Sequence, residues 1–203
     1  AVPDGATVLD MTGKTIMPGM IIAHGHVQRG HDPSIPVRDD LVRRLETYAL
    51  YGVTTVVSLG AIPEGELMQI TLRDEQDGVE LDHSRIYTSG MSINRVPAEG
   101  GGGMRPITTP EDARAAVNRV ADLEVDVVKF HVDNGPARMS DDTMGALIEQ
   151  AGARDLNAVA HLWFLADAKA TVDKGVVALG HSVCDVDVDE ALITAMKERN
   201  VGY

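Results

Sequence analysis

Short runs of apolar and β-branched residues recur along the chain and are separated by more polar stretches. The first run lies in TIMPGMIIAHGHV (residues 15–27), and the others occupy residues 53–59, 85–89, 126–132, 157–162 and 176–183. Runs of this length are typical of strands that are buried on both faces of a parallel sheet. The pattern therefore predicts six strands.

Amphipathic stretches with helical spacing follow these runs. Helices are predicted over residues 38–51, 65–77 and 164–174, and after Thr109, Ser140 and Asp187. Thr109, followed by Pro110 and an acidic third position, has the pattern of a helix start, and Asp187 is expected to cap the last helix. This alternation of strand and helix predicts a parallel sheet covered by helices.

The expected fold is an α/β incomplete TIM (β/α)8 barrel of about six β/α units. A complete barrel usually needs about 250 residues, whereas this chain has 203, and NVGY at residues 200–203 resembles the start of a seventh strand. We expect the partial barrel over residues 18–203. Residues 1–17 are predicted to be the remnant of a small β-structure, a hairpin that turns at Thr12-Gly13. On this interpretation the chain is a piece of a longer protein.

Composition narrows the choice of partners. The chain is 44% hydrophobic and 24% charged, as in ordinary globular proteins, and no apolar run is long enough to span a bilayer. Its net charge of −13 argues against nucleic acid and anionic membranes. The single cysteine, Cys184, excludes an internal disulfide framework and fits a reducing, cytoplasmic environment. A small-molecule substrate and a second copy of the chain are the partners we expect.

The one glycine cluster, EGGGGMRP (residues 99–106), lacks the Lys-Ser/Thr that follows a phosphate-binding loop. It is interpreted as a flexible loop, with a lid over a substrate as the alternative.

Histidines mark the ends of three predicted strands. His24 and His26 end the first, and residues two apart in a strand point to the same side. His161 ends the fifth strand and His181 the sixth, while Lys129 lies within the fourth. The carboxyl ends of barrel strands form the catalytic face. Imidazoles are common ligands of divalent cations, so the pattern predicts a metal site there.

Other residues near the predicted site have less specific interpretations. His131 lies two residues beyond Lys129 and is a candidate for contacting substrate or orienting a ligand. Lys129 itself is alternatively a salt-bridged or snorkelling side chain, or a lysine that forms a Schiff base as in aldolases. Pocket lining is one interpretation of Trp163, Phe164 and Met91, with ordinary packing as the expected role, and His31 and His83 are expected at loop or surface positions.

The motif GKTIMPGMIIAHGHV (residues 13–27) resembles the first-strand signature of the amidohydrolase superfamily, PGLIDAHVH. VDVVKF, AVAHL and VALGHSV resemble the ends of that family's fourth, fifth and sixth strands, and the nearest branch is that of imidazolonepropionase and Xaa-Pro dipeptidase. The resemblance implies that His24 and His26 bind a first metal, that Lys129 bridges two metals as a carbamate, and that His161 and His181 hold the second. Zinc is the expected metal, as one or two ions.

The sequence departs from the family pattern in three places. Ile22 stands where the family often has Asp, and Gly25 stands where an apolar residue is usual. The family also takes a metal-binding aspartate, which serves as general base, from an eighth strand that this chain does not reach. Asp185, Asp187 and Asp189 follow the sixth strand and are not assigned that role.

The function expected from this resemblance is hydrolysis of a C–N bond in an amide, cyclic amide or dipeptide by a metal-activated water. Two rival hypotheses remain open. One is a catalytically incomplete fragment that acts as a scaffold or binding module and associates through its open sheet edges. The other is an aldolase-type enzyme that uses Lys129 as a Schiff base.

Overall fold

The computed structural model describes residues 2–30, 32–94, 106–132 and 137–203. His31 and residues 99–105 of the glycine cluster lie outside this part. The described strands are β1 (Met20–Gly25), β2 (Val53–Ser58), β3 (Arg85–Thr88), β4 (Val128–His131), β5 (Ala158–His161) and β6 (Ala178–Leu179). The helices are α1 (Val37–Leu50), α2 (Pro63–Asp74), α3 (Pro110–Ala121), α4 (Asp141–Ala153), α5 (Leu165–Asp173) and α6 (Glu190–Arg199). Each of the six strands and six helices predicted for the partial barrel is therefore present in the described residues.

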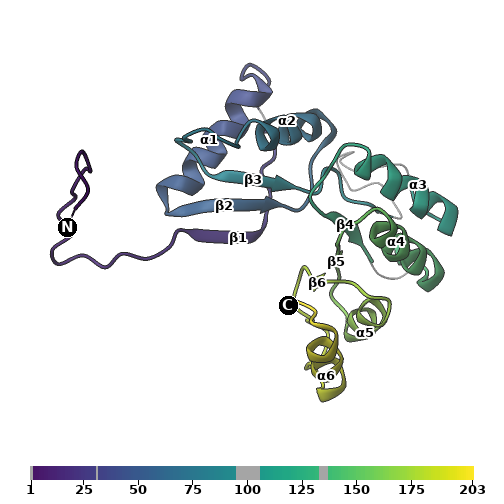
Figure 1. Cartoon of the computed structure of the whole chain (residues 1–203). Coiled ribbons are helices and arrows are strands. Elements are labelled where there is room, and N and C mark those ends of the chain that lie inside the picture. Colours follow the sequence, from purple (N-terminus) through teal and green to yellow (C-terminus); the bar gives the residue numbers. More distant parts are fainter. Residues whose placement is uncertain (1, 31, 95–105, 133–136) are drawn as a thin grey trace.

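The strands follow one another in chain order, all parallel. They form two three-stranded sheets, β1-β2-β3 and β4-β5-β6. An isolated bridge joins the sheets, because the Ile93 amide donates to the Lys129 carbonyl (2.8 Å) and the Ile93 carbonyl accepts from His131 (2.9 Å). The helices lie on the outer side of this curved succession (Figure 1). The described residues are thus α/β with six β/α units, and they do not form a closed barrel.

Beyond β6, Gly202 makes a parallel bridge to Ala178, and the Leu179 amide donates to the Gly202 carbonyl at 3.0 Å. The strand start predicted at the end of the chain is therefore confirmed.

Two apolar clusters hold the strands against the helices. The larger cluster includes Phe130 of β4, Met144 and Leu147 of α4 and Leu192 of α6. The smaller one includes Leu41 and Leu45 of α1, Val56 of β2 and Ile86 of β3. These side chains are almost completely buried, and burial of such side chains is the main stabilising contribution to the fold. The carboxyl ends of the strands, where the histidines lie, are thereby fixed in space.

The N-terminal residues 2–19 are exposed and extend away from the body of the molecule (Figure 1). The predicted turn is present, since the Lys14 amide donates to the Met11 carbonyl at 2.9 Å and Gly13 has a φ of 74°. The two predicted strands of the hairpin are not formed, and residues 6–11 and 14–17 are exposed. The assignment of residues 1–17 to a separate β-structure stays a prediction.

No helix in the described residues combines the length and apolar character needed to cross a membrane.

The cap of the last helix differs from the prediction. Thr109 forms the expected capping box of α3, and Ser140 caps α4 by accepting from the Thr143 amide. The cap of α6, however, is Asp189 and not Asp187: its side chain accepts from the Leu192 amide at 3.0 Å. The helix begins at Glu190, two residues later than Asp187 would require, so only Asp189 reaches a free first-turn amide.

We expect Asp189→Ala to lower the urea midpoint of unfolding, because the first turn of α6 loses its cap. Asp187→Ala is the matched control: the same substitution two residues earlier, at an exposed position, should leave the midpoint unchanged. Equal midpoints for the two variants would show that the side chain of Asp189 is not a stabilising cap.

Candidate metal centre

Four of the predicted histidines lie together at the carboxyl ends of the strands. The ring centroids of His24 and His26 are 5.2 Å apart, those of His24 and His181 are 4.7 Å apart, and those of His161 and His181 are 4.3 Å apart. His131 joins them by stacking on His161, with centroids 4.1 Å apart and ring planes 10° apart. The structure therefore brings together side chains that are far apart in the sequence.

His24 has a defined tautomer. Its Nδ1 lies 2.7 Å from the carbonyl oxygen of Gly180. A carbonyl only accepts, so Nδ1 must donate, and in the neutral ring the lone pair is left on Nε2. A hydrogen bond of this kind to the backbone is how proteins orient a histidine that binds a metal through its other nitrogen.

The backbone next to His26 is held by two buried polar side chains. The amide of Val27 donates to the Ser58 hydroxyl (3.1 Å), and its carbonyl accepts from the Gln69 side chain (2.7 Å). Gln69 in turn accepts from the hydroxyl of Thr88 at 2.6 Å. Sequence reasoning missed these residues, and the only signal for them was a glutamine on the inward face of a predicted helix and a serine ending a strand.

Lys129 is buried beneath the histidines. It is 1% exposed, and its Nζ has no hydrogen-bond partner among the residues that the structure describes. The amine lies against Gly180, where an added Cβ would be only 2.4 Å from Nζ. Burial lowers the pKa of Lys129 from its ordinary 10.5 to about 8, because the charged form has lost its water. A salt bridge, one of the alternatives for this lysine, is not present in the structure.

The five clustered histidines are neutral at pH 7. Burial is the main cause in every case, and it lowers the pKa of His131 to about 4, of His161 to about 3 and of His181 to about 4. The pKa values of His24 and His26 are also lowered by burial, with a further contribution from neighbouring positive charge. Neutral imidazoles have a free nitrogen lone pair, which is the form that binds metals.

The histidine side chains and Lys129 are chemically suited to bind a divalent cation, but their donor atoms do not yet surround a common point. In the described residues, no three His, Cys, Asp or Glu side chains are arranged around one point as ligands. What is present is four neutral imidazoles beside a buried, unpartnered amine. Burial of such an amine without a partner costs free energy, and a bound group that contacts it would remove that cost.

Trp163 lies beside the histidine cluster, where the alternative of pocket lining stays open. Its side chain is 39% exposed, and its indole contacts the rings of His161 (centroids 5.0 Å) and His181 (4.5 Å). Met91, by contrast, belongs to the larger apolar cluster, as expected. His83 lies in the loop before β3, where its Nδ1 is 3.0 Å from the Ser84 carbonyl.

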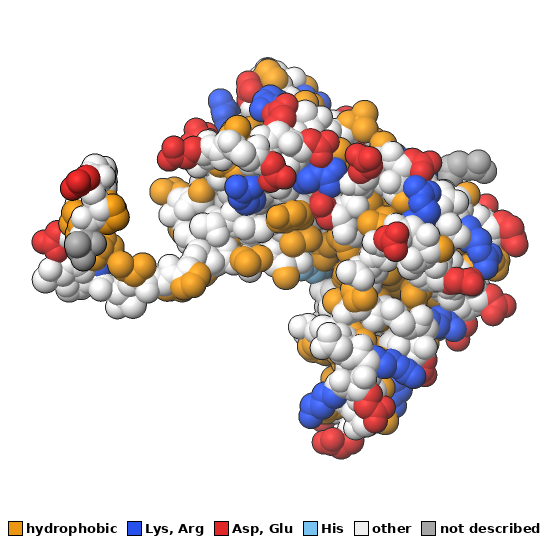
Figure 2. All heavy atoms as spheres, viewed as in Figure 1, with side chains coloured by type: hydrophobic (Ala, Val, Ile, Leu, Met, Phe, Trp, Pro, Cys, Tyr) orange, Lys and Arg blue, Asp and Glu red, His pale blue; other side chains and the backbone are white. Residues whose placement is uncertain are grey.

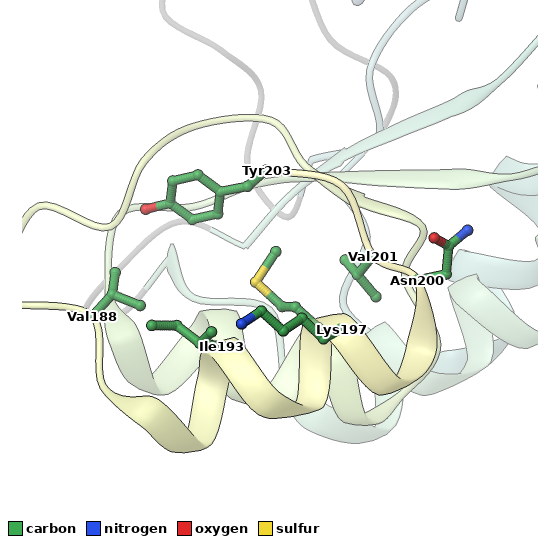
Figure 3. Close-up of a pocket in the computed structure, with 7 residues that line it drawn as sticks. Val188, Ile193, Lys197, Asn200, Val201 and Tyr203 are labelled. Atoms are coloured by element: carbon green, nitrogen blue, oxygen red, sulfur yellow. The ribbon is translucent and has the colours of Figure 1, made fainter.

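Two hollows bear on where a substrate could lie. One of about 320 Å³ is lined by His26 and by residues of α1 and its end, namely Arg44, Thr47, Tyr48 and Tyr51. The other, of about 600 Å³, lies over α6 and the chain end and is mostly apolar, with Val188, Ile193, Met196, Val201 and Tyr203 among its lining residues (Figure 3). None of the clustered histidines lines this second hollow, so we do not assign the substrate to it.

The chain is similar to several solved structures. No family model and no curated protein matches the sequence, but solved structures match it over nearly its whole length. A prolidase candidate from Bifidobacterium longum is 27% identical, with a TM-score of 0.82, over 97% of this chain and 47% of that one. A Xaa-Pro dipeptidase with bound methionine is 19% identical (TM-score 0.68, 91% and 52% covered), and phenylurea hydrolase B is also 19% identical (TM-score 0.76, 99% and 55% covered).

These matches confirm the predicted resemblance: the chain has the fold of solved amidohydrolase structures. Prolidase and Xaa-Pro dipeptidase, which belong to the branch expected from the strand motifs, are among them. The chain spans about half the length of the solved structures that it matches.

We expect Lys129→Met to raise the free energy of unfolding by about 1–3 kcal/mol, because it keeps the volume and removes an unpaired buried amine. Lys174→Met, at a partly exposed position in the cap of α5, is the control and should change stability by less than about 0.5 kcal/mol. Urea unfolding at pH 7 without added metal measures both. A loss of stability in Lys129→Met would mean that the amine has a stabilising partner.

Proposed function

We propose that the chain forms part of a metal-dependent amidohydrolase that cleaves a C–N bond in an amide, a cyclic amide or a dipeptide. The observation that carries the proposal is the gathering of four neutral imidazoles around a buried amine at the carboxyl ends of the strands. The solved structures with this fold support it, since they are described as a prolidase candidate, a dipeptidase and a phenylurea hydrolase. In fold terms, the chain is proposed to be the first six units of a (β/α)8 barrel.

The proposed ligands follow the family pattern. His24 and His26 would hold one ion, His161 and His181 a second, and Lys129 would bridge them as a carbamate. A bound divalent cation, with zinc as the expected ion, would polarise the substrate carbonyl and lower the pKa of water at the site to about 7. His131 is proposed to contact the substrate, because it stacks on His161 at the edge of the cluster.

Lys129 is suited to become an anionic ligand. A protonated amine is a cation and has no lone pair to offer, but with a pKa of about 8 a substantial fraction of this amine is neutral near pH 7–8. Attack of its lone pair on carbon dioxide forms an N–C bond and releases one proton, which leaves a carbamate with two oxygen donors. Gly180 lets the amine approach its backbone closely, because a Cβ at this position would lie only 2.4 Å from Nζ.

The chain's own residues then supply orientation. The Gly180 carbonyl holds His24 so that its Nε2 faces away from the backbone, and Ser58 and Gln69 fix the residue that follows His26. The general base that takes the water's proton is expected from an aspartate ending an eighth strand, and none of the residues described here is assigned that role. Asp185 instead accepts from the Leu165 amide at the start of α5.

The protein is expected to contain one or two divalent ions per chain and to lose hydrolytic activity on an amide or dipeptide when they are removed by chelation. His161→Asn and His181→Asn should weaken metal retention at least tenfold, whereas His83→Asn, in the loop before β3, should retain the full content. Elemental analysis of the purified complete gene product measures this.

Full turnover after exhaustive chelation would contradict the metal role. Irreversible inactivation by borohydride in the presence of a carbonyl substrate would instead indicate a Schiff base at Lys129, since a neutral amine is what that chemistry also needs.

Association with a second copy remains a separate proposal, favoured by one observation. Strand β1 pairs only with β2 in the described residues, and it exposes Met20 (47%) and Ile21 (68%). Hydrophobic side chains also line the N-terminal arm that leads into β1 (Figure 2). Unpaired apolar strand edges of this kind tend to pair with another chain.

The 203-residue chain on its own is therefore expected to elute as a dimer or larger species with low hydrolytic activity. Ile21→Lys should shift it toward the monomer, because a charge at an edge strand opposes pairing. Leu50→Lys, at a position that is 81% exposed at the end of α1, should not. Size-exclusion chromatography with light scattering distinguishes these results, and a monomeric wild-type chain would rule the association out.

A further inference from the structure

Trp163 forms a wall at one side of the histidine cluster. It lies two residues beyond His161, and its indole meets His161 edge to face (ring planes 85° apart) and tilts against His181 (37°). The remaining surface of the side chain, 39% of the whole, faces solvent. A large apolar ring is thus held against two proposed ligands and left partly open at the same time.

The position of this ring is fixed by the loops that follow β5 and β6. The Trp163 carbonyl accepts from the Cys184 amide at 2.9 Å, and two residues later the Leu165 amide donates to the Asp185 carboxylate at 2.9 Å. The two loops are therefore tied together at Trp163 and again two residues beyond it. A recognition surface that is held in place before binding loses little entropy when a ligand arrives.

We propose that Trp163 is a specificity-determining residue that selects substrates with an apolar ring next to the scissile C–N bond. The proposal rests on the proposed function, because the hydrolysed bond would lie over the histidines beside this wall. An indole face gains from covering by another ring, through burial of apolar surface and through offset or edge-to-face contact. A cationic side chain could also lie over an indole, but it would be repelled by the divalent ions proposed for the adjacent histidines.

A direct test uses fluorescence, since Trp163 is the only tryptophan in the chain. The probes are N-acetyl-L-phenylalanine amide, N-acetyl-L-alanine amide and N-acetyl-L-lysine amide, which differ only in the side chain. The phenylalanine amide should change the tryptophan emission in a saturable way and bind at least about tenfold more tightly than the alanine amide. Equal binding of these two, or tighter binding of the lysine amide, would overturn the proposal.

Hydrolysis of matched substrates provides the second test. In Trp163→Ala, the ratio of kcat/KM for the phenylalanine amide to that for the alanine amide should fall about tenfold, mainly through KM. Trp163→Phe should keep most of the ratio, because it retains a ring. An equal loss on both amides in a variant with a normal unfolding midpoint would mean that Trp163 only supports the histidines, which overturns the proposal.

The two tests separate this inference from the proposed function. If the wild-type protein holds no metal and cleaves neither amide, the proposed function fails, and the fluorescence ratio still decides the inference. If both amides are cleaved with equal kcat/KM, the inference fails and the proposed function stands.

Discussion

The candidate site is organised around the burial of one amine. Lys129 carries its Nζ into the interior, where it has no hydrogen-bond partner among the described residues, and its neighbours in β4, Val128 and Phe130, are fully buried. Such a group opposes folding by an amount comparable to a lost hydrogen bond or more, so the two apolar clusters on the helix side must offset it. A cost of this kind without a structural return is typical of a functional site. The close approach of Nζ to Gly180, where a Cβ would not fit, is likewise typical of a functional site.

Parallel register explains how distant residues reach this amine. In the β4–β5 ladder, Lys129 is paired with Val159 and His131 with His161, so the two histidines stack at the same level, one strand apart. The β5–β6 ladder pairs Ala160 with Leu179, which puts Gly180 level with His161 and His181 one residue beyond it. Because the strands are parallel, each of them ends at the same edge. The cluster is thus a consequence of strand order and register, and not of any contact between neighbouring residues in the sequence.

The sequence was sufficient for this part because the apolar runs mark where strands end. β5 was predicted at residues 157–162 and forms at Ala158–His161, which places His161 correctly. The sequence was not sufficient to predict the roles of Gly180, Ser58 and Gln69, because these roles depend on distances across the fold. It also did not fix the orientation of Trp163, because a side chain in a loop can point to either side. β6 illustrates the limit: residues 176–183 were predicted, but only Ala178–Leu179 are regular, since the chain then turns so that Gly180 meets Lys129 and His24.

One hydrogen bond joins the first and the sixth β/α units at the site. The bond from His24 Nδ1 to the Gly180 carbonyl joins residues 156 positions apart and links the first strand to the last regular one, across the mouth of the curved sheets. The two sheets otherwise meet only at the Ile93–Phe130 bridge among the strand pairings of the described residues. Gly180 therefore serves both ends of the site: its carbonyl orients His24, and its missing Cβ makes room for Lys129. A side chain at this position would disturb both at once, so the donor atoms of β1 and β4 are coupled through the backbone of β6.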